Sequence, residues 1–326
     1  MTGIVNGTID NLEADNLYLT VDNLIELSGA ISTNSLTEPS KALVNLYVDE
    51  FNTSLKNLKK VIPGFKPPDQ FYKLDPISFT GDIEGFFNDF VIYGSLTSSL
   101  GKVGLDSRLD IKNGIEDARY SGEISLDNFD LKTWTDNDDF GYASLNARID
   151  DGRGLTLETV KTDMSANLEQ FHFKGYDYTG ISLEGLLEKN LFNGVFSAND
   201  PNLDLDFKGE IDLTDDIIKS DFNADIRQID LVALNLSKDF SAINGNFDLT
   251  LDGSNTKDVF GSLDVKNLEL MYKEKTFDFD SLYLTSSAAL DGKRDVILTS
   301  DLVDASINGV FDFAALGGSF KNILYD

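Results

Sequence analysis

The chain has 326 residues, of which 56 are acidic and 27 basic, so its formal net charge is −29. Hydrophobic residues make up 41%, with 23 Phe and 11 Tyr, which is typical of a folded protein and excludes a disordered acidic tail. The acidic surface repels nucleic acid, so we expect no nucleic-acid partner. The absence of cysteine excludes disulfides, thiolate zinc sites and cysteine nucleophiles.

The first residues, Met1 to Gly7, lack the basic and apolar regions of a signal peptide, and no run reaches the length of a transmembrane helix. Strand-like alternation begins almost at once and predicts a β-repeat segment over residues 1–37. We therefore expect the chain to be an internal piece of a longer protein.

One segment departs from this alternation. Residues 38–62 place six apolar side chains at spacings of 4, 4, 4, 3 and 4, and these are Leu43, Tyr47, Phe51, Leu55, Leu58 and Ile62. This spacing predicts one amphipathic helix that packs against the sheet or closes one end of it. A helix on a membrane surface is the alternative. The Pro-rich stretch 63–76 predicts a linker.

Residues 77–326 return to a period of two. In the clearest example, Leu203, Leu205 and Phe207 alternate with polar residues, and Asn-Gly or Asp-Gly turns separate such runs. This pattern predicts one elongated domain of antiparallel β-meanders, each strand having an apolar and a polar face. A loose repeat recurs at irregular spacing, which argues against a propeller or a leucine-rich array.

Candidate catalytic groups are few. His172 is the only histidine, and the pairs Asp138–Asp139, Asp150–Asp151 and Asp215–Asp216 fall in an acid-rich chain where such adjacency is expected by chance. Residues 136–141 begin like a calcium loop but have Phe and Ala where the fifth and twelfth positions need oxygen ligands. We expect no enzyme activity, no metal and no cofactor.

The order of five short motifs resembles the translocation and assembly module (TamB) family of the AsmA-like superfamily, in its Bacteroidota form. The resemblance covers most of residues 77–270, and its motifs are residues 79–85, 94–102, 120–131, 173–185 and 200–213. It implies a long antiparallel sheet curved into an open groove (a β-taco). It also implies a periplasmic protein anchored in the inner membrane outside this segment, with an Omp85-type outer-membrane partner.

The same resemblance implies that the groove carries phospholipid acyl chains between the two membranes and supports outer-membrane assembly. Period-two alternation nominates seven groove positions: Ile124, Leu126, Leu203, Leu205, Phe207, Leu249 and Leu251. From the residues alone, the apolar faces could equally pack together as a closed core. A structural or adhesive β-solenoid and a polysaccharide-active β-helix enzyme are the alternatives.

Overall fold

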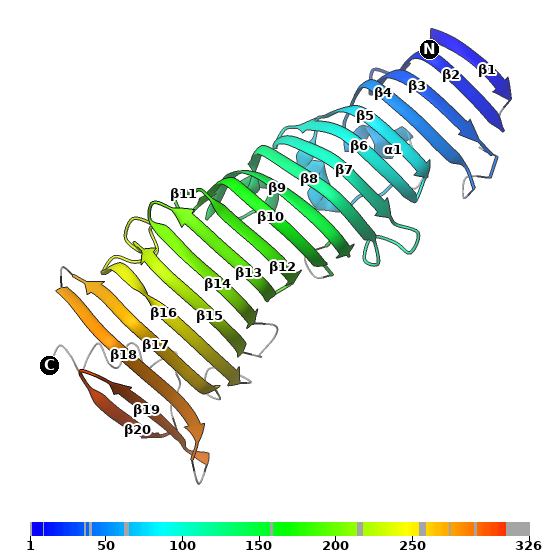
Figure 1. The fold of residues 1–326 in the computed structure, drawn as a ribbon. Helices are drawn as coiled ribbons and strands as arrows, with labels where there is room; N and C mark the ends of the chain where they lie inside the picture. The colour runs from blue at the N-terminus through cyan, green and yellow to red at the C-terminus, as the bar shows by residue number, and fades with distance from the viewer. Residues whose placement is uncertain are drawn as a thin grey trace. The chain divides into compact units, whose positions relative to one another are not determined.

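The structure is a computed structural model, and it describes residues 2–8, 10–35, 37–38, 41–61, 65–156, 159–213, 218–253, 259–273, 275–289 and 292–310. Strands account for 71% of the chain and helices for 7%, and the pairing is antiparallel and open (Figure 1). The predicted all-β class is therefore confirmed. The chain divides into two compact units, Met1–Phe173 and Lys174–Asp326.

Unit 1 is an antiparallel meander in which each strand pairs with the next along the chain. Its strands are β1 (Thr2–Thr8), β2 (Asn11–Val21), β3 (Ile25–Asn34), β4 (Leu43–Thr53), β5 (Ile77–Phe86), β6 (Asp89–Ser98), β7 (Gly101–Asp110), β8 (Arg119–Asp130), β9 (Phe140–Arg153) and β10 (Lys161–Phe173). The helical elements are α1 (Leu55–Val61), the 3-10 helix η1 (Asp69–Leu74) and α2 (Leu131–Thr135). Because β4 pairs with β5, the Pro-rich stretch connects two neighbouring strands of one sheet.

The helix predicted over residues 38–62 is present only as α1, and the prediction is wrong over β4. A spacing of four is also an even number, so Leu43 and Tyr47 share one face of a strand as readily as one face of a helix. The alternate residues Val44, Leu46 and Val48 form the other face. Val48 is 1% exposed and Tyr47 is 55% exposed, as a two-faced strand requires.

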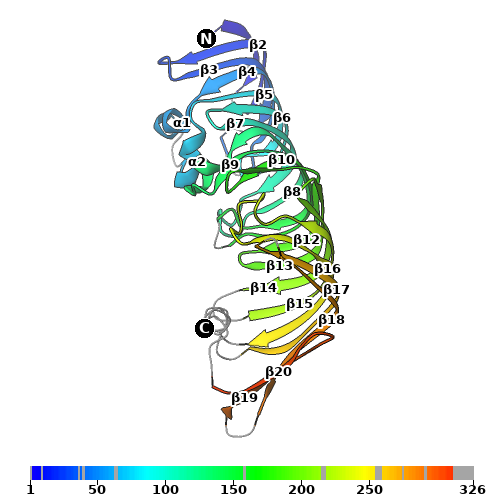
Figure 2. The ribbon, with the colours of Figure 1, turned by 90° about the vertical axis from the view of Figure 1, so that its left-hand side faces the viewer.

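The helical elements of unit 1 pack on one face of its sheet, around which the strands curve (Figure 2). Leu55 and Leu58 of α1 bury themselves with Ile25 at one end of this face. Trp134 of α2 makes edge contacts with Phe71 and Phe129, with ring centroids 5.5 Å and 5.9 Å apart. The segment expected to be a linker is thus a cover, in which η1 buries Leu74 against Leu100 and Phe129.

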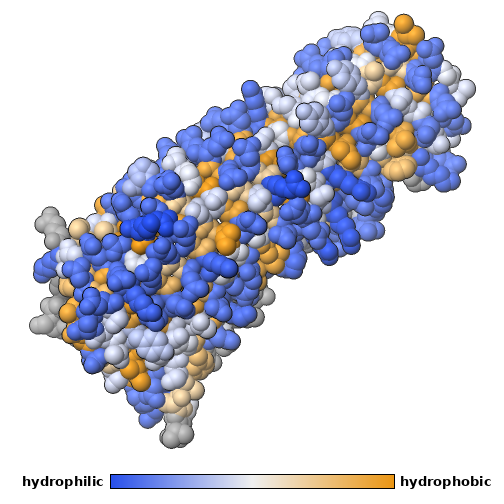
Figure 3. Space-filling view, viewed as in Figure 1, coloured by the Kyte–Doolittle hydropathy of each residue, from blue (hydrophilic) through white to orange (hydrophobic). Residues whose placement is uncertain are grey.

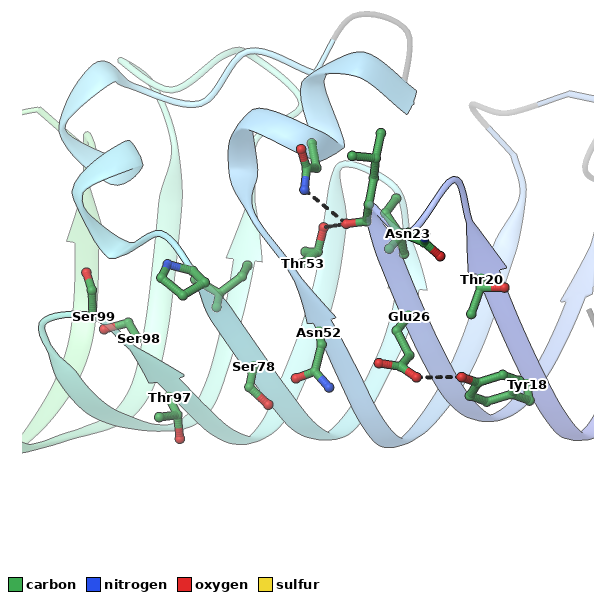
Figure 4. Close-up of a pocket in the computed structure, with 15 residues that line it drawn as sticks. Tyr18, Thr20, Asn23, Glu26, Asn52, Thr53, Ser78, Thr97, Ser98 and Ser99 are labelled. Carbon is green, nitrogen blue, oxygen red and sulfur yellow. Dashed lines mark hydrogen bonds between the residues drawn. The ribbon is translucent and has the colours of Figure 1, made fainter.

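Hydrogen bonds join α1 to the turn between β2 and β3. The carbonyl oxygen of Leu24 accepts hydrogen bonds from Thr53 Oγ1 at 2.9 Å and from Asn57 Nδ2 at 3.1 Å (Figure 4). The carboxylate of Asp75 accepts from the backbone N–H of Leu55 at 2.6 Å. These bonds satisfy polar groups at the start of a helix too short to be stable alone, so α1 depends on its packing against the sheet.

Glycines in mid-strand allow the strands of unit 1 to bend. Gly81 of β5 and Gly94 of β6 are direct partners and have φ of +145° and +157°. A Cβ on Gly81 would lie 2.6 Å from Gly94 Cα and would overlap the carbonyl oxygen of Tyr93. A positive φ and this close approach both require glycine, so the pair marks a tight bend of the sheet.

Unit 2 is a second antiparallel meander, in which β12 to β20 each pair with the next. Its strands are β11 (Tyr176–Tyr178), β12 (Ile181–Glu188), β13 (Leu191–Asp200), β14 (Leu203–Asp212), β15 (Ile218–Ile229), β16 (Phe240–Gly253), β17 (Val259–Tyr272), β18 (Lys275–Ala288), β19 (Arg294–Ser300) and β20 (Asp304–Gly309). Gly185, Gly194 and Gly209 are successive partners here. No helix among the described residues is both long and apolar enough to span a membrane.

Asp200, a buried carboxylate, joins two turns of unit 2. It is 4% exposed and accepts hydrogen bonds from Tyr176 Oη (2.5 Å), Thr179 N (2.9 Å) and Asn202 N (2.9 Å). Burial raises the pKa of Asp200, but the hydrogen bonds to Tyr176, Asn202 and Thr179 outweigh it and hold the pKa below its usual value.

We expect Asp200→Ala to lower the free energy of unfolding by about 3 kcal/mol at neutral pH, because its donors lose their buried acceptor. A depressed carboxyl pKa gives stability above the unfolded-state pKa of about 4, and this stability is lost as pH falls through the lower folded pKa. Urea unfolding at several pH values is the measurement. The difference between wild type and variant is expected to shrink below pH of about 4, and a constant difference would contradict this role.

Candidate functional site

The apolar face of unit 1 contains no charged residue over a large area. The strand register places one residue from each of β2 to β10 in each of four rows across the sheet, and none of these residues is charged. The most apolar row is Leu19, Leu27, Phe51, Phe79, Leu96, Val103, Leu126, Leu145 and Leu168. Charged residues make up a quarter of the chain, so their absence from all four rows distinguishes this face from the rest of the protein.

Most large side chains of these rows are only half-buried. Leu96, Val103, Leu105 and Ile124 all retain solvent exposure, whereas Phe79 beside them is 5% exposed. In a closed core such side chains would be fully enclosed. The helical elements α1, η1 and α2 pack near one end of the strands, where Val103 and Leu126 lie against Leu74, Leu100 and Phe129, and no described helix packs on the rest of the face. We call this face, with its four rows, the apolar groove of unit 1.

Unit 2 has the same arrangement. Its rows likewise carry no charge over most of the sheet. One of the two rows that run through nine strands is Gly185, Gly194, Gly209, Phe222, Leu249, Leu263, Leu284, Leu298 and Ala305. Aromatic rings lie side by side on this face, with the centroids of Phe207 and Phe222 5.0 Å apart. We call it the apolar groove of unit 2.

The seven positions predicted from period-two alternation all lie on these faces. Ile124 and Leu126 lie in adjacent rows of the unit 1 groove. The other five lie in the unit 2 groove and are Leu203, Leu205, Phe207, Leu249 and Leu251. All seven are half-buried.

The opposite face of each unit carries the charge. In unit 2, the Arg227 guanidinium bonds Asp204 at 2.6 Å and Asp206 at 2.7 Å, and these carboxylates raise the pKa of Arg227 further. In unit 1, Arg148 pairs with Glu123 at 3.3 Å and with Asp150 at 3.1 Å. Figure 3, seen from the side opposite to α1 and α2 of unit 1, shows hydrophilic side chains over much of that face.

One depression of unit 1 lies beside the strand ends of β2 to β6 and the start of α1. It has a volume of about 600 Å³, and a row of Glu26, Asn52, Ser78 and Thr97 forms one wall (Figure 4). Tyr18 Oη donates to Glu26 at 2.5 Å, and this hydrogen bond to a carboxylate raises the pKa of Tyr18. Besides this pair, the depression is lined by scattered hydroxyl and amide groups such as those of Thr20, Asn23 and Ser98.

The acidic candidates are dispersed. Asp136 and Asp138, in the segment that begins like a calcium loop, pair with different lysines: Lys73 at 2.6 Å and Lys132 at 2.9 Å. Asp150 and Asp151 bond Arg148 and Arg153 at 3.1 Å and 3.3 Å. Over the described residues, no three His, Asp or Glu side chains come together as metal ligands. His172 is half-buried beside Gly141, and Asp215–Asp216 lie outside the described residues.

Two features of the groove were not predicted from the sequence. The alternation did not show that mid-strand glycines such as Gly81 and Gly94 bend the strands, although their place among the apolar positions was the available signal. Nor did it show that α1, η1 and α2 cover one end of the face. That cover depends on contacts across long sequence separations, such as Phe71 with Trp134.

Comparison with protein-family models finds no match, and comparisons with curated proteins and with solved structures find none either. Any assignment of function therefore depends on the geometry of the two grooves together with the motif resemblance.

Proposed function

We propose that the apolar grooves bind lipid acyl chains, and that the chain is a segment of a bridge-like lipid-transfer protein. The observation that carries the proposal is the apolar face of each unit, which is free of charge across many strands and only half-buried. Soluble proteins rarely leave such extended apolar surfaces exposed without a ligand or partner to cover them.

The proposed mechanism is passive. Each methylene of an acyl chain gains about 0.8 kcal/mol when it leaves water for an apolar surface. Successive strands offer equivalent side chains, for example Leu96, Val103 and Leu126 in one row, so an acyl chain meets similar surface as it moves across them. The polar head group stays in water at the open side, because no charged partner in the groove would compensate its burial.

The motif resemblance extends this proposal to the whole protein. We propose a periplasmic protein held in the inner membrane by an anchor outside this segment. It would pass phospholipid towards the outer membrane with an Omp85-type partner and support outer-membrane assembly. The acidic polar faces, which keep the sheet soluble, are compatible with this environment.

A photo-crosslinking amino acid at two adjacent positions of β8 tests the proposal. Ile124 lies in the groove, and Glu123 points to the polar face and is exposed. In the full chain purified from cells, crosslinking at position 124 is expected to capture phospholipid, detected by mass spectrometry. Crosslinking at position 123 is expected to capture little. Native mass spectrometry that finds no lipid on the unmodified chain would contradict acyl-chain binding.

Strand pairing bears on the alternative of a β-solenoid. In a β-solenoid, successive coils stack with parallel strands around a filled interior. Here the consecutive strands pair antiparallel from β1 to β10 and from β12 to β20. We therefore prefer the groove to a solenoid.

A further inference from the structure

The segment that covers the unit 1 groove is basic in an acidic protein. Residues 54–74 contain five lysines and one aspartate, a local net charge of +4, whereas the whole chain carries −29. Three of these lysines, Lys56, Lys59 and Lys60, fall within the seven residues of α1, and Lys66 follows shortly after it. We call these four side chains the basic patch.

The basic patch faces solvent. All four lysines are exposed, whereas Leu55 and Leu58 on the other side of α1 are buried against the sheet. Lys59 Nζ lies 5.8 Å from the centre of the Tyr72 ring, within the range of a cation–π contact at an exposed site. No ion pair involves these four lysines within the described residues, in contrast to Lys73, which bonds Asp136 at 2.6 Å.

One acidic group beside the patch, Asp75, reduces its charge without cancelling it, because residues 54–75 still carry a net charge of +3. Asp75 is engaged as the cap of α1, where its carboxylate accepts hydrogen bonds from the backbone of Leu55 (2.6 Å) and Lys56 (3.4 Å). At physiological ionic strength, charges farther away than about 8 Å are largely screened, so a partner at the patch experiences mainly the lysines.

We propose that the basic patch docks on the surface of an anionic phospholipid bilayer. Charge complementarity carries the proposal, because clustered lysines on an amphipathic helix are attracted to anionic head groups. The position of α1 adds to it. The apolar side of the helix packs against Val21 and Phe51 of the sheet and against Leu24 in the turn between β2 and β3, so a bilayer at the lysines would lie beside the end of the groove. This docking is independent of acyl-chain binding within the groove.

Vesicle flotation of the full chain tests the docking. We expect binding to phosphatidylcholine vesicles that contain phosphatidylglycerol, and none to vesicles of phosphatidylcholine alone. Each lysine near an anionic surface contributes roughly fivefold in affinity, so the triple variant Lys56→Gln, Lys59→Gln and Lys60→Gln is expected to bind roughly 100-fold more weakly. Glutamine retains helix propensity, and circular dichroism checks that the sheet is intact.

A matched control variant removes the same number of positive charges at three positions outside the basic patch. Lys102, Lys208 and Lys275 are exposed lysines on strands, and their triple replacement by glutamine is expected to change vesicle binding by less than about twofold. Equal binding of the two triple variants, equal binding to neutral vesicles, or no binding of wild type to anionic vesicles would each overturn the proposal. Native mass spectrometry separates the two hypotheses, because loss of docking with bound lipid retained leaves the groove function standing.

Discussion

Leu205→Asp is expected to remove bound lipid from the unit 2 groove while leaving the sheet folded. Leu205 is half-buried on the apolar face, so an aspartate there keeps some contact with water when the groove is empty. When an acyl chain covers the position, the carboxylate loses that hydration at a cost of at least about 3 kcal/mol. This corresponds to binding weaker by more than about 100-fold. Native mass spectrometry measures lipid occupancy, and thermal unfolding measures stability.

Val195→Asp is the matched control for this experiment. Val195 is 41% exposed on the polar face of the adjacent strand, where Lys208 is its direct partner in β14. It introduces the same carboxylate but next to a cation and away from the groove, so lipid occupancy is expected to stay at the wild-type level. If Leu205→Asp unfolds unit 2, the apolar face is a closed core; if it folds and keeps its lipid, the groove is not the binding site.

Gly81→Ala is expected to destabilise the protein strongly, by about 3–5 kcal/mol in urea unfolding. The new Cβ would overlap the carbonyl oxygen of Tyr93 and lie 2.6 Å from Gly94 Cα, and the backbone φ of +145° disfavours any side chain. To make room for the new Cβ, β5 and β6 would have to move apart at Gly81 and Gly94. The variant therefore tests the curvature of the groove through stability.

Gly114→Ala separates the cost of the positive φ from the cost of the steric overlap. Gly114 also has a positive φ, +92°, but it lies in the turn after β7, where a Cβ would have no neighbouring atom within 4 Å among the described residues. We expect this control to lose only about 1 kcal/mol, the usual cost of strained backbone for alanine. Equal losses for the two variants would show that β5 and β6 do not approach closely at Gly81.

Alternation predicted the faces of the strands well because the side-chain period of a strand is a local property. Leu203, Leu205 and Phe207 point to one side whatever the strand pairs with, so their shared face could be read from the chain. The prediction of a helix from spacings of three and four was wrong for residues 43–53, because a spacing of four fits a strand as well as a helix. Contacts of Val48 between β3 and β5 decide that element, and these are not visible locally.

By itself, the sequence determined the all-β class, the two-faced strands and the face on which the seven nominated residues lie, because each follows from composition and a period of two. Only the tertiary structure decided whether the apolar faces are covered. Their exposure depends on where distant segments pack: α1 and α2 cover one end of the unit 1 face, and Gly81 and Gly94 allow the strands to bend around it. Whether an apolar face becomes a core or a groove is set by such long-range packing, which no local pattern encodes.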